Sequence, residues 1–138
     1  YGAIALHYAT RDAESTRLLI ASFPAGVLAR DDAGQTPLHR CARRGTVAAC
    51  KVLLDAFLGS SVLDVADRYH GYTPLRIALC FGKRDIAELL LARGAQLGNV
   101  KFDAGYTAVP AWAVDFATRR NACRDACWAV LRCARSIG

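Results

Sequence analysis

The sequence lacks a long apolar run, any methionine and a large excess of one charge. No stretch of 18 residues is without a charged side chain, since the nearest approach, residues 49–66, contains Lys51, Asp55 and Asp64. We therefore expect no membrane-spanning helix. The chain begins at Tyr1 without methionine, so its natural start is expected upstream and a targeting signal cannot be assessed. The 54% hydrophobic composition excludes disorder as the main state.

Motifs typical of enzymes are also missing. The sequence shows no nucleophile beside a plausible base, no glycine-rich phosphate loop and no carboxylate pair in a pocket-forming context. We therefore predict that the chain is not an enzyme and needs no cofactor. Its formal net charge of +6 permits an acidic partner without requiring one.

Six cysteines allow two interpretations. A small secreted chain would use them as a disulfide framework, but such frameworks are typical of shorter, loop-rich sequences. Here the cysteines fall inside apolar helical patterns, which favours free thiols in a reducing compartment. We expect an intracellular protein, cytoplasmic or nuclear. The six are Cys41, Cys50, Cys80, Cys123, Cys127 and Cys133.

A repeat runs through most of the chain. Residues 34–45 (GQTPLHRCARRG) align with residues 71–82 (GYTPLRIALCFG), and segments 2–9 and 105–112 are weaker copies. The steps from Ile4 to Thr36, Thr73 and Thr107 are 32, 37 and 34 residues. A period of this length predicts stacked structural units.

The T-P-L-H pattern followed by glycine and a leucine-rich run resembles the ankyrin-repeat family, whose unit is about 33 residues. The residue types suit their places, because threonine caps a helix, proline fits its first turn and glycine permits the turn between two helices. The resemblance implies an all-α solenoid of stacked helix-turn-helix pairs with short β-hairpin-like connections. It implies one domain, 1–138, with repeats at about 1–33, 34–70, 71–104 and 105–138, the first and last being imperfect caps.

The pattern predicts a helix pair in each repeat. Pro24 should end the second helix, because its ring cannot continue the hydrogen-bond ladder. Connections are expected at 29–35, 65–72 and 100–106. The predicted helices are 5–12, 15–22, 37–44, 47–58, 74–81, 84–92, 109–119 and 121–136.

Histidine and cysteine candidates for metal binding have simpler interpretations. His7 and His39 hold the fourth position of T-P-L-H, where the resemblance implies hydrogen bonds between neighbouring repeats. Cys123 and Cys127, with Cys133 nearby, are the best metal candidates. Their side chains lie in an apolar helical stripe, however, and small buried cysteines in place of alanine explain them. Cys41 also stands where the family pattern has alanine. We predict no metal site.

A basic face on the last helix offers a second binding hypothesis. Residues 119–138 contain five arginines and one aspartate. On a helical wheel Arg120, Arg124, Arg132 and Arg135 lie opposite the cysteine stripe. This face is either a solvated outer surface or a site for an acidic surface or nucleic acid. Nucleic acid is the weaker hypothesis, because no aromatic residues alternate with the arginines to stack on bases.

The main hypothesis is a protein-protein interaction module, scaffold or adaptor. The resemblance implies binding through a concave face formed by the hairpins and inner helices, where arginine and aromatic residues are frequent in binding hot spots. The expected partner is another protein with an acidic segment and apolar anchors, bound by a monomeric fragment. The predicted binding residues are Arg43, Arg44, Arg68, Tyr69, His70, Tyr72, Phe81, Lys101, Phe102 and Tyr106.

Overall fold

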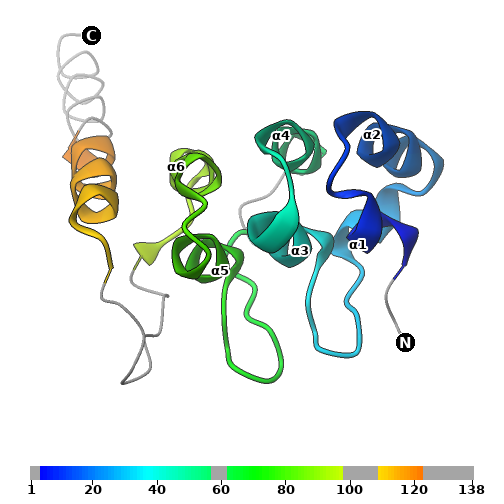
Figure 1. Cartoon of the computed structure of the whole chain (residues 1–138), viewed down its shortest axis with the longest axis horizontal. Helices are drawn as coiled ribbons and strands as arrows, with labels where there is room; N and C mark the ends of the chain where they lie inside the picture. Colours follow the sequence, from blue (N-terminus) through cyan, green and yellow to red (C-terminus); the bar gives the residue numbers. More distant parts are fainter. Residues whose placement is uncertain (1–3, 57–61, 98–108, 123–138) are drawn as a thin grey trace, which may run out of the picture.

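Pairs of helices stack side by side along the chain in the computed structural model, which describes residues 4–56, 62–97 and 109–122 (Figure 1). The described residues contain helices and turns and no strand, which confirms the all-α class. A further helix covers 111–122, where the described part ends. The named helices are α1 (Ala5–Ala9), α2 (Ala13–Ser22), η1 (Pro24–Leu28), α3 (Pro37–Arg44), α4 (Val47–Asp55), α5 (Pro74–Cys80) and α6 (Arg84–Arg93).

The helices form two layers. The inner layer contains α1, α3 and α5, and the outer layer contains α2, α4 and α6 (Figure 1). Within each layer a helix packs against the next one in chain order, and each inner helix also packs against the outer helix that follows it. The segments between pairs extend away from both layers on one side (Figure 1). This is the predicted solenoid of helix-turn-helix pairs.

Threonine and proline start the helices as the repeat pattern predicts. Pro37 and Pro74 occupy the first turns of α3 and α5, where a missing N–H removes no helical hydrogen bond. The Thr73 hydroxyl accepts a hydrogen bond from the Arg76 amide at 3.3 Å. The Thr46 hydroxyl likewise caps α4 by accepting from the Ala49 amide at 3.2 Å.

The core repeats with the same period as the sequence. Leu38 and Leu75 are buried at matching positions of α3 and α5, and Leu53 and Leu90 at matching positions of α4 and α6. Cys41 is fully buried, as expected for a residue in the place of alanine. A hydrogen bond with Cys50 and burial raise the pKa of the Cys41 thiol, so it stays protonated and acts as a small apolar side chain.

Several helix boundaries differ from the prediction, including the end of α4 at Asp55 rather than residue 58 and the start of the last helix at 111 rather than 109. The first helix ends at Ala9 rather than residue 12, because the Asp12 carboxylate accepts from the Ser15 amide at 2.8 Å and so starts α2 early. Pro24 ends α2 as expected but also begins the unpredicted η1. The last helix runs through residue 120, where a break between helices was expected.

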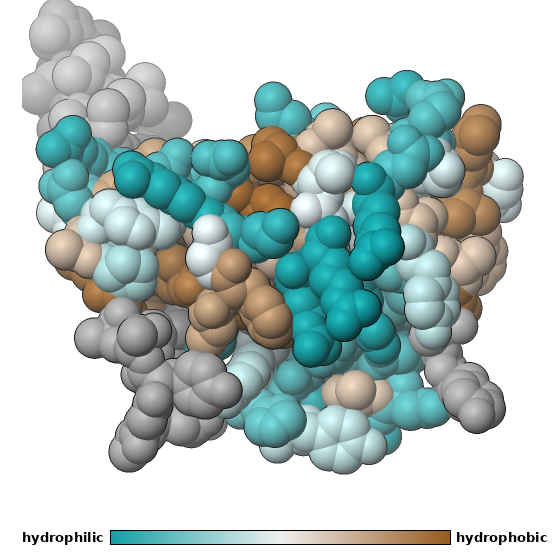
Figure 2. All heavy atoms as spheres, in the orientation of Figure 1, coloured by the Kyte–Doolittle hydropathy of each residue, from teal (hydrophilic) through white to brown (hydrophobic). Residues whose placement is uncertain are grey.

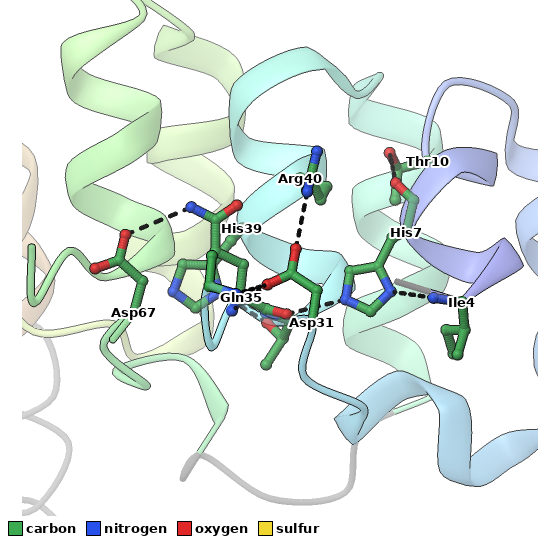
Figure 3. Close-up of polar contacts among 10 residues, drawn as sticks. Ile4, His7, Thr10, Asp31, Gln35, His39, Arg40 and Asp67 are labelled. Atoms are coloured by element: carbon green, nitrogen blue, oxygen red, sulfur yellow. Dashed lines mark hydrogen bonds and ion pairs between the residues drawn. The ribbon is translucent and has the colours of Figure 1, made fainter. Parts of the chain in front are cut away.

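Two buried histidines join the first repeat to the second and the second repeat to the third. In His39 the Nδ1 atom accepts from the Thr36 amide at 3.1 Å, and Nε2 lies 3.0 Å from the Tyr72 carbonyl oxygen. An amide can only donate, so the ring is neutral and carries its proton on Nε2. His7 makes the equivalent contacts with the Ile4 amide and the Gln35 carbonyl oxygen, the latter at 2.9 Å (Figure 3). The structure thus gives both histidines their predicted linking role.

Gly45 and Gly82 occupy matching positions after α3 and α5 for different physical reasons. Gly82 has φ +64°, a left-handed conformation that other residues rarely adopt. Gly45 has φ −78°, which any residue adopts. A Cβ on Gly45, however, would lie 2.7 Å from the Cys41 carbonyl oxygen. Gly82 is therefore required for its left-handed conformation, and Gly45 is required because a side chain there would clash with Cys41.

Substitutions at these glycines should separate the two reasons. Gly45→Ala should lower the free energy of unfolding by about 1–3 kcal/mol through overpacking, and Gly45→Asn should lower it further. At Gly82 the order should reverse, because asparagine adopts the left-handed conformation more readily than alanine. Urea unfolding followed by circular dichroism measures all four. The same order of alanine and asparagine at both positions would contradict this explanation.

His39 should make stability depend on pH. Burial lowers the pKa of His39 below its ordinary 6.5, although the hydrogen bond to the Tyr72 carbonyl partly opposes this. As the pH falls below 6.5, the unfolded chain binds a proton that the folded chain refuses, so the free energy of unfolding should fall. The lowered pKa values of Asp31 and Asp67 affect the free energy of unfolding only around and below pH 3.8, the ordinary pKa of aspartate.

Urea titrations at pH 7.5, 6.5 and 5.5 test this dependence. His39→Gln should be less stable than the parent at pH 7.5 but should show a flatter pH dependence between 7.5 and 5.5. Equal slopes for parent and variant would mean that another group controls stability in this range.

Candidate functional site

An aspartate organises each described connection between repeats. The Asp67 carboxylate accepts from the His70 amide at 2.9 Å and the Tyr72 amide at 3.1 Å, and the backbone closes the loop from the Asp67 amide to the Tyr72 carbonyl at 2.9 Å. Asp31 makes the matching contacts with the amides of Ala33 and Gln35. These loops, residues 29–36 and 65–73, are hereafter the hairpins.

The two hairpins also contact each other. The Arg68 amide donates to the Ala33 carbonyl oxygen at 2.8 Å, and the Gln35 side chain reaches the Asp67 carboxylate at 3.4 Å (Figure 3). Burial of Asp67 opposes its ionisation, but the hydrogen bonds from the His70 and Tyr72 amides and from Gln35 outweigh it and lower the pKa of the carboxyl. The hairpins are therefore held in place without a strand.

A groove of about 600 Å³ lies between the second and third repeats. One wall comes from the hairpins and the other from the inner helices α3 and α5. We call it the aromatic groove. Its lining residues are Gln35, Asp67, His70 and Tyr72 from the hairpins, and Arg43, Ile77, Cys80 and Phe81 from or next to the helices.

Aromatic rings in the groove are paired with cations or with each other. The Arg43 guanidinium lies 5.0 Å from the centre of the Phe81 ring, within the range of a cation–π contact. The rings of His70 and Tyr72 have centroids 5.0 Å apart. Phe81 nevertheless keeps 52% of its surface exposed. The groove therefore presents apolar surface that stays in contact with water.

A second pocket of about 360 Å³ adjoins the first, between the first and second repeats. We call it the arginine pocket. Its charged lining comes from Arg11, Arg40, Arg43 and Arg44, together with His7, Tyr8 and Thr10. Figure 2 shows the resulting contrast, with strongly hydrophilic side chains over α3 beside hydrophobic atoms over α5. Arg43 lines both hollows.

The repeat offset accounts for both linings. Tyr8 and Arg11 plus 32 residues give Arg40 and Arg43. At an offset of a further 37 residues, the positions of Arg40, Arg43 and Arg44 correspond to Ile77, Cys80 and Phe81. The same face of successive inner helices thus changes from basic to apolar along the solenoid.

The structure brings some of the predicted residues together and separates others. Arg43, His70, Tyr72 and Phe81 line the aromatic groove, and Arg44 lines the arginine pocket. Arg68 and Tyr69 are exposed on the hairpin and line neither hollow. Lys101, Phe102 and Tyr106 lie outside the described residues, as do Cys123, Cys127, Cys133, Arg124, Arg132 and Arg135.

Four groove residues, Gln35, Asp67, Ile77 and Cys80, are absent from the predicted binding residues. Ile77 lies one helical turn before Cys80 and Phe81, so it shares their face of the helix. Its match to Arg40 at the 37-residue offset could therefore have identified it. Asp67 carried no comparable signal, because its contacts are to backbone amides that only the folded hairpin brings together.

Arg120 differs from its predicted role in an exposed basic face. Its guanidinium donates to the Leu91 carbonyl oxygen at the end of α6, and the side chain is partly buried there. The neighbouring Arg119 forms an ion pair with Asp115 at 3.0 Å. In the described part of this helix, both arginines are therefore engaged within the chain.

The described residues hold no cluster of three or more histidine, cysteine or acidic side chains placed to bind a metal ion. Cys41, Cys50 and Cys80 are free thiols. Among the helices of residues 4–56, 62–97 and 109–122, none has the length and hydropathy needed to cross a bilayer.

Residues 6–101 match the family model for ankyrin repeats in three copies, and the chain belongs to the ankyrin-repeat family. Ankyrin repeats generally serve as non-catalytic modules for protein-protein interaction. The matched range ends before residue 105, so the fourth repeat at 105–138 stays a prediction.

Curated relatives share this region. The chain is 32% identical over 92 residues to the B-cell lymphoma 3 protein homolog of Mus musculus, which covers 67% of this chain and 20% of that protein. It is 37% identical over 71 residues to the transient receptor potential cation channel subfamily A member 1 homolog of Caenorhabditis elegans (51% and 6%). It is 30% identical over 95 residues to transient receptor potential cation channel subfamily A member 1 of Homo sapiens (68% and 8%). The chain spans one fifth or less of these relatives.

Loss of the Asp67 carboxylate should loosen the groove wall. In Asp67→Ala the amides of His70 and Tyr72 lose their acceptor, so their hydrogen exchange should accelerate about tenfold or more, as expected when a hydrogen bond to a charged group worth about 1.5–3 kcal/mol is lost. Exchange measured by NMR should stay nearly unchanged in the buried helix α4. Unchanged protection in the hairpin would show that backbone contacts alone hold it.

Proposed function

We propose that this chain is a protein-binding module that holds an extended segment of a partner protein in the aromatic groove. The observation that carries the proposal is the exposed aromatic surface of Phe81 in one hollow with the Arg43 guanidinium, which forms no ion pair with a described carboxylate. The partner segment is acidic and contains at least one large apolar side chain. The module itself performs no catalysis.

The apolar part of the groove supplies the binding energy. Phe81 is half exposed, Cys80 precedes it directly and Ile77 lies one turn earlier, so an apolar side chain entering here removes surface from water on both partners. The Tyr72 ring is partly buried, its centre lies 4.2 Å from the Arg76 guanidinium and it contacts the His70 ring, so little side-chain freedom is lost on binding. Rigid aromatic anchors of this kind are typical hot spots.

The charged part of the groove selects the partner. No carboxylate among the described residues forms an ion pair with Arg43, and its side chain is exposed. Such a group attracts acidic chains and repels basic ones. The Asp67 carboxylate keeps its charge, but it is buried and bonded to the His70 and Tyr72 amides and Gln35, whereas the Arg43 guanidinium is exposed to a partner.

Selection from a random peptide display library tests the proposal. The selected peptides should share acidic residues beside an aromatic or large aliphatic anchor. Phe81→Ala should weaken their binding by about 2 kcal/mol, or roughly thirtyfold in Kd, because the anchor loses its main contact. Arg43→Gln should weaken binding about tenfold. Fluorescence anisotropy at physiological salt measures both.

Phe23→Ala is the matched control, because Phe23 is 56% exposed at the end of the outer helix α2. It should leave binding unchanged. Tyr69→Ala should have a smaller effect than Phe81→Ala, because Tyr69 lies outside the groove lining. Basic consensus peptides, or binding that survives Phe81→Ala but not Phe23→Ala, would overturn the proposed groove.

A further inference from the structure

The arginine pocket carries more positive charge than a simple acidic side chain needs. Four guanidinium groups line it, from Arg11, Arg40, Arg43 and Arg44. The Asp31 carboxylate pairs with Arg40 at 2.8 Å (Figure 3). The carbonyl end of α3 adds about half a negative charge. Roughly 2.5 positive charges therefore remain uncompensated in this estimate.

Other nearby polar groups do not neutralise this charge. The Asp12 carboxylate, next to Arg11 in sequence, accepts from the amide and hydroxyl of Ser15 at the start of α2. Among the described residues, no carboxylate forms an ion pair with Arg11, Arg43 or Arg44. His7 uses its ring nitrogens on the Ile4 amide and the Gln35 carbonyl oxygen.

We propose that the arginine pocket receives the phosphoryl group of a phosphorylated serine or threonine in the partner segment that occupies the aromatic groove. This inference rests on the proposed function. A phosphoryl group carries about −1.5 to −2 charges and three strong acceptor oxygens. A carboxylate offers one charge and two oxygens in a plane, which a single arginine satisfies. Guanidinium groups from both sides of the pocket, Arg11 beside α1 and Arg44 on α3, match the larger, tetrahedral group.

The size and place of the pocket agree with this ligand. Its 360 Å³ is near the lower end of the roughly 300–1,000 Å³ typical of small-ligand sites. Arg43 lines both the pocket and the groove, so one bound segment reaches both. Neighbouring helices pack about 8–10 Å apart, and an extended chain advances about 3.3 Å per residue. The apolar anchor should therefore lie about three residues from the phosphorylated one.

Three degenerate peptide libraries test the inference, each with one fixed central residue: phosphoserine, serine or glutamate. Fluorescence anisotropy at physiological salt should show binding at least tenfold tighter for the phosphoserine library than for the serine library, with glutamate between them. The tightest phosphoserine peptides should be enriched in large apolar residues about three positions from the centre.

Variants assign the preference to the pocket. Arg11→Gln and Arg44→Gln should each reduce the preference for phosphoserine about tenfold while leaving the binding of serine peptides nearly unchanged. Arg17→Gln is the matched control, because Arg17 is an exposed arginine on the outer helix α2. It should change nothing. Arg43 is left intact, because it serves both hollows.

The outcomes separate the two proposals. Equal binding of phosphoserine and serine peptides, both sensitive to Phe81→Ala, would reject the phosphoryl site and keep the protein-binding groove. Phosphoserine preference that survives Arg11→Gln with Arg44→Gln would place the site elsewhere and also reject the pocket. If a single-stranded oligonucleotide bound through the same arginines as tightly as the phosphoserine peptides, the pocket would be a general polyanion site. Insensitivity of all peptides to Phe81→Ala would reject the groove instead.

Discussion

The buried imidazole between successive repeats is the contact on which the rest of this structure depends. His39 accepts from the amide at the start of its own helix and donates to the carbonyl of the next hairpin. His7 does the same one repeat earlier. Because a solenoid repeat contacts only its neighbours, these joints set the position of each hairpin against the preceding inner helix. The hairpin residues that line the aromatic groove are held at that position.

The inner helices contain two kinds of position, which either pack in the core or line the surface hollows. Leu38 and Leu75 point into the core and keep the same residue type from one repeat to the next. Positions five and six residues later vary, with Arg43 and Arg44 in the second repeat replaced by Cys80 and Phe81 in the third. The fold therefore needs the same residue type at matching core positions but tolerates different residue types at matching surface positions. That contrast places a cationic hollow beside an apolar one.

The sequence predicted the elements whose signals are local. The starts of α3, α4 and α5 follow from their threonine caps and the repeat period, and the start of α6 follows from the period alone. The early end of α1 did not, because it depends on competition between the continuing helix and the Asp12 cap. In the site, Arg43 and Phe81 were predictable from composition at repeat positions. The exclusion of Tyr69 from the groove, and the place of Asp67 within it, depend on how the hairpin turns, which three-dimensional backbone contacts decide.

The joint between repeats uses a backbone carbonyl as its acceptor, at Gln35 for His7 and at Tyr72 for His39. The side chains of these same two residues line the aromatic groove. A main-chain acceptor is present whatever side chain the residue carries. Mutation can therefore exchange the groove-facing side chains, and so redirect recognition, while the two histidines keep their hydrogen bonds to the next repeat. In evolutionary terms, the chain is robust at its joints and free to diversify at the surface those joints present.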